Sequence, residues 1–386
     1  MTPASAPATP APRRHIAFVV NTDWFFLSHR LPLAQEAIRR GWRVTLVAPD
    51  TGRFGEVQAH GIETVDLGMS RSGMNPVREA VSVARLARIY RRLRPDLIHH
   101  VTPKPVVFGS LAARAVPGVP VVNAVSGLGY AFADKSRWHP LPRIMRLLYR
   151  AALRRPRTWA IFQNEDDRRF FVNVGLIARE RTVLIRGSGV DTAEFAPSPE
   201  PDGTPVVMMP ARLLWDKGVR EFVDAAERVR AAGVDARFAI AGPLDEGNPA
   251  AVRRDEVEAW VAEGRVEWWG NQTDMPSAYR RSTLVALPSY REGLPKALLE
   301  AGAAARARVT TDVPGCRGTV RHEETGLLVP AQDADGLADA LIRLLRDDGL
   351  RESLRVAGRT DVEANYAVEH VVSAHVDVYN SALDTI

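Results

Sequence analysis

The sequence predicts an α/β protein with two domains, each built around a parallel β-sheet. Short apolar runs alternate with amphipathic helical segments, which is the pattern of repeated βα units. The alternation begins at residue 15 and starts again after the Pro-rich stretch 197–201. A length of 386 residues, with 46% apolar and 25% charged residues, suits two globular domains with separate cores.

Each element follows from its hydrophobic period. The predicted strands of the first half are 15–20, 43–48, 96–99, 119–123 and 158–162, and its predicted helices are 27–40, 76–93 and 105–115. Predicted strands of the second half lie near 205–209, 236–241, 266–268, 283–287, 307–310 and 326–329, with helices between them and three at the end, the last over 367–381. We therefore expect a disordered tail at 1–14, an N-terminal domain at 15–196, a C-terminal domain at 197–365, and a final helix at 366–386 that packs back on the N-terminal domain.

Composition excludes several classes of protein. The single cysteine, Cys316, excludes a disulfide framework and a Cys-based zinc site. No apolar run approaches the ~20 residues that span a bilayer. Residues 2–12 are rich in Pro, Ala and Thr and lack the apolar core of a signal peptide, so we expect a tail.

Charge is unevenly distributed along the chain. Residues 1–190 contain 29 Lys/Arg against 13 Asp/Glu, whereas the remainder contains 22 against 33. A basic half can bind nucleic acid or anionic lipid. The sequence shows no zinc-finger, RNA-recognition or basic-zipper pattern, so we expect an anionic membrane surface and no nucleic acid.

The run from Glu292 to Glu300 is the most informative segment for function. Pro295 suits the first turn of a helix, which places Glu292 just before the helix N-terminus and Glu300 on its second turn. A helix N-terminus attracts anions, so two flanking carboxylates can hold the hydroxyl-rich ends of a ligand with phosphate in its middle. A nucleotide sugar has this shape. The alternative is that Glu292 only caps the helix and that Glu300 is an ordinary surface glutamate. The spacing of the two carboxylates, taken alone, favours this alternative.

A second motif supports the nucleotide-sugar interpretation. Arg212 and Lys217 flank the turn between the predicted strand 205–209 and the helix that follows, where open α/β sheets bind ligands. Arginine can bind phosphate bidentately and lysine adds a mobile charge. The chain has only four lysines against 47 arginines, which makes a lysine here notable. Together the two cations could neutralise a diphosphate leaving group.

Over nearly its whole length, the chain resembles the retaining glycosyltransferase family 4. The motifs that carry the resemblance are Arg212…Lys217-Gly218, Glu292…Glu300 and Gly187-Ser-Gly-Val-Asp191. Longer strings over 211–222, 288–295 and 311–317 resemble the branch that builds capsule, O-antigen and other lipid-linked oligosaccharides in bacteria. The resemblance implies the GT-B fold, in which two Rossmann-like domains face each other across a cleft.

The same resemblance implies roles for residues of the C-terminal domain. Arg212, Lys217 and Glu292 would be catalytic. The residues implied in donor binding are Gly242, Gly270, Asn271, Gln272, Gly293, Leu294 and Glu300. Gly242 and Gly270 each end a predicted strand, where glycine lets backbone approach a ligand closely. No cofactor and no metal are expected.

Candidates in the N-terminal half are less specific. Asn21 and His29 lie in a predicted ligand-facing loop after the first strand, and Lys104 follows another strand. Ser126 stands where many family members have a histidine that faces the transferred sugar. We assign these four residues to the acceptor side. The neighbouring Arg30 could equally be a solvated helix residue.

Three other features remain open or are set aside. His99 and His100 point to opposite faces of a strand and are read as structural rather than acceptor-lining. Asp333-Ala-Asp335 resembles a metal-binding motif, but it precedes a helix and is read as a cap. The segment 141–155 is a basic amphipathic helix that suits either an anionic interface or a core with a solvated face, and the charge asymmetry favours the membrane.

One departure from the family concerns the end of the helix that carries Glu300. Where the family commonly has Ala-Ala-Gly-Arg-Pro, this chain has Ala304-Ala-Arg-Ala-Arg308. Because the helix-ending glycine is absent, the helix is expected to run longer or to fray differently, at a cost near 1 kcal/mol.

The sequence thus predicts a peripheral enzyme on the cytoplasmic face of the plasma membrane. It would transfer a sugar, with retention, from a nucleoside-diphosphate sugar, UDP by resemblance, to a saccharide on a polyprenyl diphosphate. Two alternatives remain: a sugar-nucleotide 2-epimerase of the same fold, and a non-catalytic GT-B partner protein.

Overall fold

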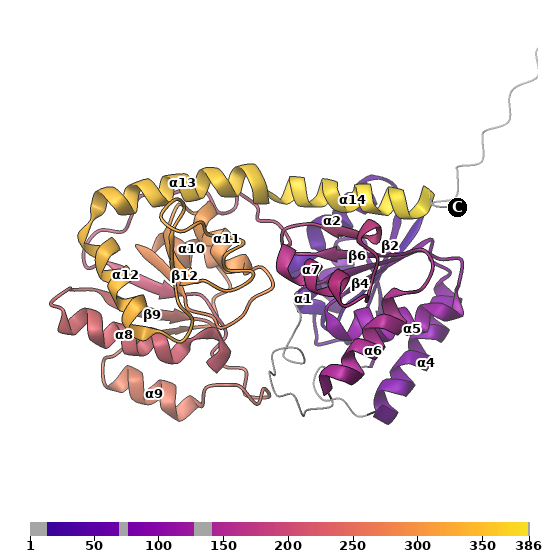
Figure 1. Cartoon of the computed structure of the whole chain (residues 1–386), viewed down its shortest axis with the longest axis horizontal. Coiled ribbons are helices and arrows are strands. Elements are labelled where there is room, and N and C mark those ends of the chain that lie inside the picture. Colours follow the sequence, from indigo (N-terminus) through magenta and orange to yellow (C-terminus); the bar gives the residue numbers. More distant parts are fainter. Residues whose placement is uncertain (1–13, 69–75, 127–140, 385–386) are drawn as a thin grey trace, which may run out of the picture. The chain divides into compact units, whose positions relative to one another are not determined.

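The structure is a computed structural model that describes residues 14–68, 76–126 and 141–384 (Figure 1). The chain divides into two compact units. The first unit comprises Met1–Ala124, Pro140–Ala160 and Asp377–Ile386, and the second comprises Val125–His139 and Ile161–Val376. The domain boundaries expected from the sequence stay predictions, and residues 1–13 of the expected tail lie outside the described residues.

A sheet of seven strands is formed by the first half of the chain. Its order is β3-β2-β1-β4-β5-β6-β7. The strands are β1 (His15–Val19), β2 (Arg43–Ala48), β3 (Glu63–Asp66), β4 (Leu97–Val101), β5 (Val121–Val125), β6 (Thr158–Phe162) and β7 (Thr182–Leu184). β1 pairs with β2 and β4 in parallel, and every residue of β1 and β4 is buried, as expected for a sheet covered on both faces. The sequence missed β3 and β7.

The helices of this half are α1 (Asp23–His29), α2 (Leu31–Arg39), α3 (Phe54–Ala59), α4 (Pro76–Leu93), α5 (Ser110–Ala112), α6 (Leu141–Leu153) and α7 (Glu165–Asn173), with a π-helix η1 (Pro105–Gly109). The prediction of one helix at 27–40 after a loop was wrong. Helix α1 already begins at Asp23, and the chain breaks at Arg30 because Pro32, in the first turn of α2, has no N–H to continue the hydrogen bonding.

The second sheet has six strands in the order β10-β9-β8-β11-β12-β13. They are β8 (Val206–Met209), β9 (Arg237–Ala241), β10 (Glu267–Gly270), β11 (Leu284–Leu287), β12 (Ala307–Thr311) and β13 (Leu327–Val329). The helices are α8 (Val219–Ala231), α9 (Arg254–Ala262), α10 (Met275–Arg280), α11 (Lys296–Ala303), α12 (Ala334–Arg346), α13 (Asp348–Tyr366) and α14 (Val368–Asp384), and a 3-10 turn η5 spans Trp215–Lys217. The strands expected in this half are all present.

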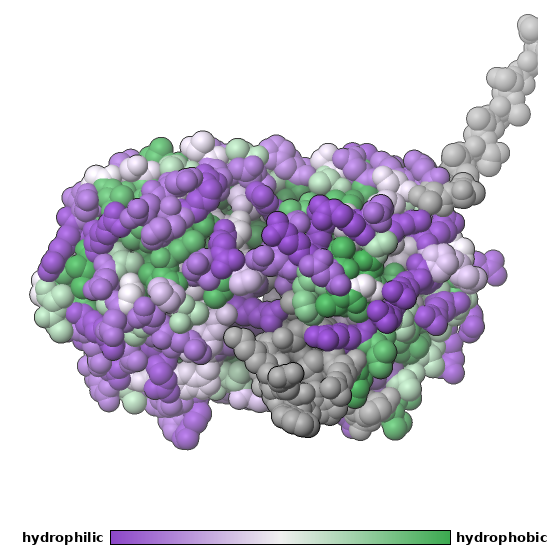
Figure 2. All heavy atoms as spheres, in the orientation of Figure 1, coloured by the Kyte–Doolittle hydropathy of each residue, from purple (hydrophilic) through white to green (hydrophobic). Residues whose placement is uncertain are grey.

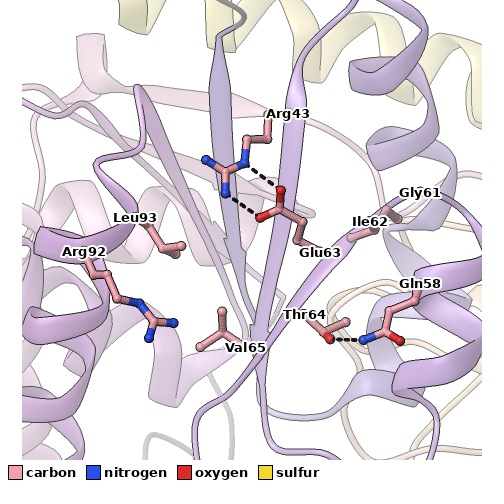
Figure 3. Close-up of a pocket in the computed structure, with 9 residues that line it drawn as sticks. All are labelled: Arg43, Gln58, Gly61, Ile62, Glu63, Thr64, Val65, Arg92 and Leu93. Carbon is pink, nitrogen blue, oxygen red and sulfur yellow. Dashed lines mark hydrogen bonds and ion pairs between the residues drawn. The ribbon is translucent and has the colours of Figure 1, made fainter.

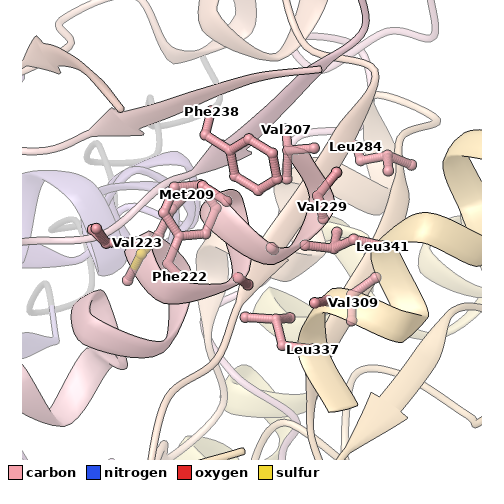
Figure 4. Packing of buried hydrophobic residues seen from close by; sticks show 14 of the residues in the cluster. Val207, Met209, Phe222, Val223, Val229, Phe238, Leu284, Val309, Leu337 and Leu341 are labelled. Carbon is pink, nitrogen blue, oxygen red and sulfur yellow. The ribbon is translucent and has the colours of Figure 1, made fainter. Parts of the chain in front are cut away.

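Helices α8 and α12 pack against each other and against one face of this sheet. Figure 4 shows Phe222 of α8 beside Phe238 of β9, and Leu337 and Leu341 of α12 beside Val309 of β12. Their side chains are at most 3% exposed. A second apolar cluster includes residues of α11 and α13. This packing holds in place the strands β8 and β11, after which the loops with Lys217 and Glu292 follow.

The helix that carries Glu300 ends without the family's glycine. Helix α11 stops at Ala303, and Ala305 adopts φ +51°, the left-handed conformation that glycine adopts more easily. The helix is therefore not extended, and an alanine bears the strain. Immediately afterwards, Arg306 and Arg308 are both fully buried. The Arg308 guanidinium donates to the carbonyl oxygens of Leu298, Thr319 and Thr325 at 2.9–3.2 Å.

The predicted cap at Asp333 is confirmed, because its side chain accepts a hydrogen bond from the backbone N–H of Gly336 at 2.9 Å. Across the described ranges, no helix combines the length and the apolarity that crossing a bilayer requires.

Candidate functional site

The second sheet reverses its strand order between β8 and β11. From β8 the chain adds β9 and β10 on one side, and from β11 it adds β12 and β13 on the other. In open α/β sheets, ligands bind beyond the carboxyl ends of the strands at such a switch point. The loop with Arg212 and Lys217 follows β8, and the loop with Glu292 follows β11. The two motifs singled out in the sequence therefore leave the sheet at neighbouring strands.

Lys217 is positioned by a close backbone contact at the next residue. It ends the 3-10 turn η5, and Gly218 follows with φ +77°. A Cβ on Gly218 would lie only 2.1 Å from the carbonyl oxygen of Pro288, so the two loops touch through backbone. Glycine is required here both by the left-handed conformation and by the lack of space.

Glu292 receives two hydrogen bonds on one carboxylate oxygen. The Lys217 ammonium donates to Oε1 at 2.5 Å, and the Ser289 hydroxyl donates to the same atom at 2.8 Å. Both ion-pair side chains are largely shielded, at 19% and 13% exposure. Ser289 is fully buried, and its carbonyl oxygen accepts from the Thr311 hydroxyl of β12. The carboxylate is thus held in place from two adjoining strands.

Arg212 is paired in the same way. Its guanidinium donates to Asp245, which lies in the loop after β9, at 2.5 Å. The Leu213 N–H donates to the carbonyl of Pro243 at 3.0 Å, which joins the two loops. Both cations that were assigned to the diphosphate therefore carry a carboxylate partner.

Glu300 lies on the second turn of α11, as predicted, and is 8% exposed. Its two oxygens are occupied separately: Lys296 pairs with Oε1 at 3.0 Å, and the Tyr279 hydroxyl donates to Oε2 at 3.1 Å. Burial raises the pKa of Tyr279 well above its usual range, so its hydroxyl remains a proton donor. Pro295 precedes α11 as its N-cap residue rather than lying in its first turn.

Gly293 and Leu294 are closely packed against other loops of the second unit. A Cβ on Gly293 would lie 2.2 Å from the carbonyl oxygen of Ser126, and the Asn164 amide donates to the Gly293 carbonyl at 2.9 Å. Leu294 packs on Gly187, because a Cβ on Gly187 would lie only 2.6 Å from the Leu294 side chain. The backbone of Ser126 therefore lies next to the loop that carries Glu292. The assignment of Ser126 to the acceptor side stays a prediction.

Two glycines assigned to the donor site differ from each other. A Cβ on Gly242 would lie 1.8 Å from the carbonyl of Ala211, so this glycine is needed for loop packing rather than for approach to a ligand. Gly270 has φ +68° and open space where a Cβ would stand. Beyond it, Asn271 is exposed, while the Gln272 amide donates to the Trp269 carbonyl and accepts from Arg281.

The acceptor-side candidates of the first unit have defined surroundings. Oδ1 of Asn21 is buried without a hydrogen-bond partner, His29 stacks on Phe25 with ring centroids 4.2 Å apart, and Lys104 pairs with Glu79 at 2.7 Å. Their assignment to the acceptor side stays a prediction. Arg30 is 2% exposed, so its reading as a solvated residue was wrong. Burial lowers the Arg30 pKa to about 10.

His99 and His100 are structural, as the sequence favoured. Both are fully buried, and His99 accepts or donates a hydrogen bond with Tyr379 at 2.9 Å, whereas His100 contacts Tyr90 and Asn123 at 2.9 Å. Burial lowers the pKa of His100 to about 4, which keeps its ring neutral at physiological pH.

A separate cavity of about 590 Å³ lies at the edge strand β3 (Figure 3). Two of its charged lining residues pair with each other, because Arg43 donates twice to Glu63 at 2.7 Å. Gln58 likewise donates to Thr64. We assign no function to this cavity.

Four residues at the second-unit site were missed by the sequence reasoning: Ser289, Asp245, Tyr279 and Lys296. Only Lys296 had a readable signal, since it lies four residues before Glu300 on a predicted helix. Asp245 and Tyr279 meet their partners through the tertiary fold alone.

Two protein-family models match the chain. "Glycosyl transferase 4-like" matches residues 15–164, and "Glycosyl transferases group 1" matches residues 190–361. The resemblance seen in the motifs is thereby confirmed: the chain belongs to the glycosyltransferases that combine these two parts, and it has the GT-B fold.

Individual relatives are distant, and one of them matches nearly the whole chain. The chain is 26% identical to an N,N'-diacetylbacillosaminyl-diphospho-undecaprenol α-1,3-N-acetylgalactosaminyltransferase of Campylobacter jejuni, over 94% of this chain and 99% of the relative. It is 24% identical to a UDP-Gal:α-D-GlcNAc-diphosphoundecaprenol α-1,3-galactosyltransferase of Escherichia coli, over 70% and 72%. Among solved structures, HepE of Anabaena in complex with UDP-glucose superposes with a TM-score of 0.77 at 18% identity, covering 95% of this chain and 99% of that one.

Proposed function

We propose that this glycosyltransferase is a retaining enzyme that moves a sugar from a nucleoside-diphosphate sugar, with UDP the favoured nucleotide, to a saccharide on a polyprenyl diphosphate. The observation that carries the proposal is the pairing of Lys217 with Glu292 at the switch point of the second sheet. A cation and a carboxylate in contact suit a ligand that presents an anionic diphosphate beside a neutral, hydroxyl-rich sugar.

Each residue has a role in this proposal. Arg212 and Lys217 neutralise the diphosphate, and Glu292 accepts hydrogen bonds from the sugar hydroxyls. Glu300, held by Tyr279 and Lys296, accepts from the ribose hydroxyls. Gly270 leaves space for the base, which Asn271 would contact. The contacts that occupy the Gln272 amide make it the weaker of the two base-binding candidates.

The reaction is a front-face displacement. The bond between the anomeric carbon and the diphosphate oxygen breaks, the acceptor hydroxyl oxygen forms the new bond on the same face, and the leaving phosphate oxygen takes the acceptor's proton. The pair of electrons from the broken bond stays on the diphosphate, where Arg212 and Lys217 stabilise it. No metal ion and no cofactor take part in the proposed step.

The names of the relatives support the substrates. The relatives in Campylobacter and Escherichia act on undecaprenyl-diphosphate-linked sugars, and the second uses UDP-galactose. An enzyme with such an acceptor works at the membrane that holds it. We therefore place this chain on the cytoplasmic face of the plasma membrane as a peripheral protein, attached through its basic N-terminal part.

The proposal is tested by measuring nucleoside-diphosphate release from UDP-, GDP-, ADP- and dTDP-sugars, with and without short-chain polyprenyl-diphosphate saccharides, in the presence of EDTA. We expect release from one donor only when acceptor is present, with retained configuration in the product. Isomerised donor without any acceptor would indicate the epimerase. Weak nucleotide binding with no turnover on any pair would indicate the non-catalytic partner.

A further inference from the structure

Four of the six large apolar side chains that are exposed among the described residues lie on two helices of the first unit. They are Val77 and Val81 on α4, at 73% and 61% exposure, and Ile144 and Leu147 on α6, at 49% and 66%. All four occupy the first two turns of their helix. Isolated exposed apolar residues need no explanation, but a group of this kind indicates an interaction surface.

The two helices belong to one layer. Both α4 and α6 pack against the same central segment, formed by η1 and α5. Figure 1 shows that their first turns point in the same direction, towards the lower edge of the view. In Figure 2, hydrophobic side chains emerge between hydrophilic ones over this part of the first unit.

Helix α6 does not consist simply of a buried face and a solvated polar face. Met145, Tyr149 and Leu153 form its buried face, at no more than 8% exposure. Leu147 lies on the opposite side, where residues three and seven positions further are Arg150 and Arg154, both exposed. A face that only met water would gain nothing from leucine at its centre.

Helix α4 repeats this arrangement. Val81 lies between Arg78, three positions before it, and Arg85 and Arg88, four and seven positions after it. The exposed arginines of the two helices and the residue after α6 are Arg78, Arg85, Arg88, Arg91, Arg92, Arg146, Arg150 and Arg154. The described parts of α4 and α6 contain one acidic residue, Glu79, which is 9% exposed and faces inward to pair with Lys104.

We infer that the outer face of α4 and α6 docks on an anionic phospholipid surface. Val77, Val81, Ile144 and Leu147 enter the boundary between headgroups and acyl chains, and the arginines contact lipid phosphates. Charge complementarity selects this occupant, because a second copy of the chain would bring an equally cationic face against this one. The inference deepens the proposed function by naming the surface through which the enzyme reaches a lipid-linked acceptor.

Vesicle binding measured without donor or acceptor tests the inference separately from the chemistry. The full chain is mixed with vesicles of phosphatidylcholine alone or with added phosphatidylglycerol, and the bound fraction is determined by flotation. We expect binding only with the anionic lipid, and a loss of at least about tenfold in Ile144→Ser/Leu147→Ser, because each leucine-sized side chain contributes about 1.5–3 kcal/mol on full burial.

Matched variants separate the docking face from general effects. Val261→Ser/Val356→Ser removes the two other exposed large apolar side chains, which lie on α9 and α13, and should bind as the unmodified chain does. Arg88→Gln/Arg150→Gln should weaken binding roughly fivefold per arginine, since each cation near the surface contributes ~1 kcal/mol. Arg228→Gln/Arg343→Gln in the second unit should leave it unchanged.

Three results would overturn the inference. One is equal binding to neutral and anionic vesicles, and another is equal loss in the docking and control variants. The third is a dimer in sedimentation velocity that Ile144→Ser/Leu147→Ser converts to a monomer, which would make the face an interface between copies. Polyprenyl-diphosphate saccharides with short chains need no vesicle, so sugar transfer and vesicle binding are measured independently. Sugar transfer can therefore fail while vesicle binding is observed, and vesicle binding can fail while sugar transfer is observed.

Discussion

Arginines in the second unit meet carboxylates across the fold, whereas those of α4 and α6 in the first unit share their helices with a single acid. Typical pairs of the second unit are Arg228–Asp335, Arg237–Glu267, Arg321–Asp361 and Arg351–Glu200. The same pairing extends to the candidate site, where Lys217 and Arg212 contact Glu292 and Asp245.

The difference indicates two uses of positive charge. A cation paired with a carboxylate has a fixed place, which suits recognition of one compact ligand. A group of exposed cations on helices that contain a single acid produces a potential over a whole face, which acts on an extended anionic partner and weakens with added salt. The following predictions test the paired half of this comparison, and the vesicle experiment tests the other.

The largest effect is expected at the pair itself. Lys217→Ala and Glu292→Gln should each reduce kcat about 10²-fold or more, because each removes an interaction with the transition state. Steady-state kinetics with the donor identified by nucleotide release provides the measurement. Arg343→Ala, at an exposed ion pair of the same unit, serves as the control. Near-native turnover in both variants would remove Lys217 and Glu292 from the catalytic site.

Arg308 is an exception in the second unit, since backbone carbonyls surround it. Burial lowers its pKa to about 10, so it remains charged at neutral pH. Arg308→Ala should reduce the free energy of unfolding by about 2 kcal/mol, because buried carbonyl groups lose their donor. Urea denaturation measures this. Arg343→Ala should change stability by less than about 0.5 kcal/mol. If the two variants cost the same, the buried guanidinium has no special structural role.

Ala305 provides a smaller effect with an adjacent control. Ala305→Gly should stabilise the protein by about 1 kcal/mol, because the left-handed conformation at φ +51° costs alanine more than glycine. Ala304 has φ −75°, so Ala304→Gly should bring no gain. The urea midpoints of the two variants are compared with that of the unmodified protein. A higher midpoint in both variants, or in neither, would show that backbone strain at Ala305 is unimportant.

The smallest effect concerns the competition between Asp245 and the diphosphate for Arg212. Asp245→Asn should tighten UDP binding by a few-fold at most, because a partly exposed ion pair contributes less than ~1 kcal/mol. Titration calorimetry with UDP measures the change, and Glu246→Gln in the same loop is the control. Weaker binding in Asp245→Asn would show instead that Asp245 orients Arg212 for the ligand.

The sequence predicted the strands of the second sheet and the placement of Arg212, Lys217 and Glu292, because buried parallel strands are apolar runs and turn glycines mark their ends. It did not locate β3, because this strand has only four residues, none of them buried, and therefore lacks the apolar run that marks the other strands. Nor did it give Asp245 and Tyr279, since their contacts join residues 33 and 21 positions apart through the tertiary fold. The sequence indicated that Gly242 ends a strand, but it could not show that the carbonyl of Ala211 leaves no space for a side chain there.

The single cysteine has a practical consequence. Cys316 is fully buried, and burial, together with the negative charge of Glu292, raises its thiol pKa to about 12. Since the thiolate is the reactive form, the folded protein should resist alkylating reagents. Labelling should then proceed only when the loop around Cys316 opens. The labelling rate therefore reports how often the structure near Glu292 opens locally. Cys316 therefore allows ligand binding near Glu292 to be followed by mass spectrometry, without any engineered label.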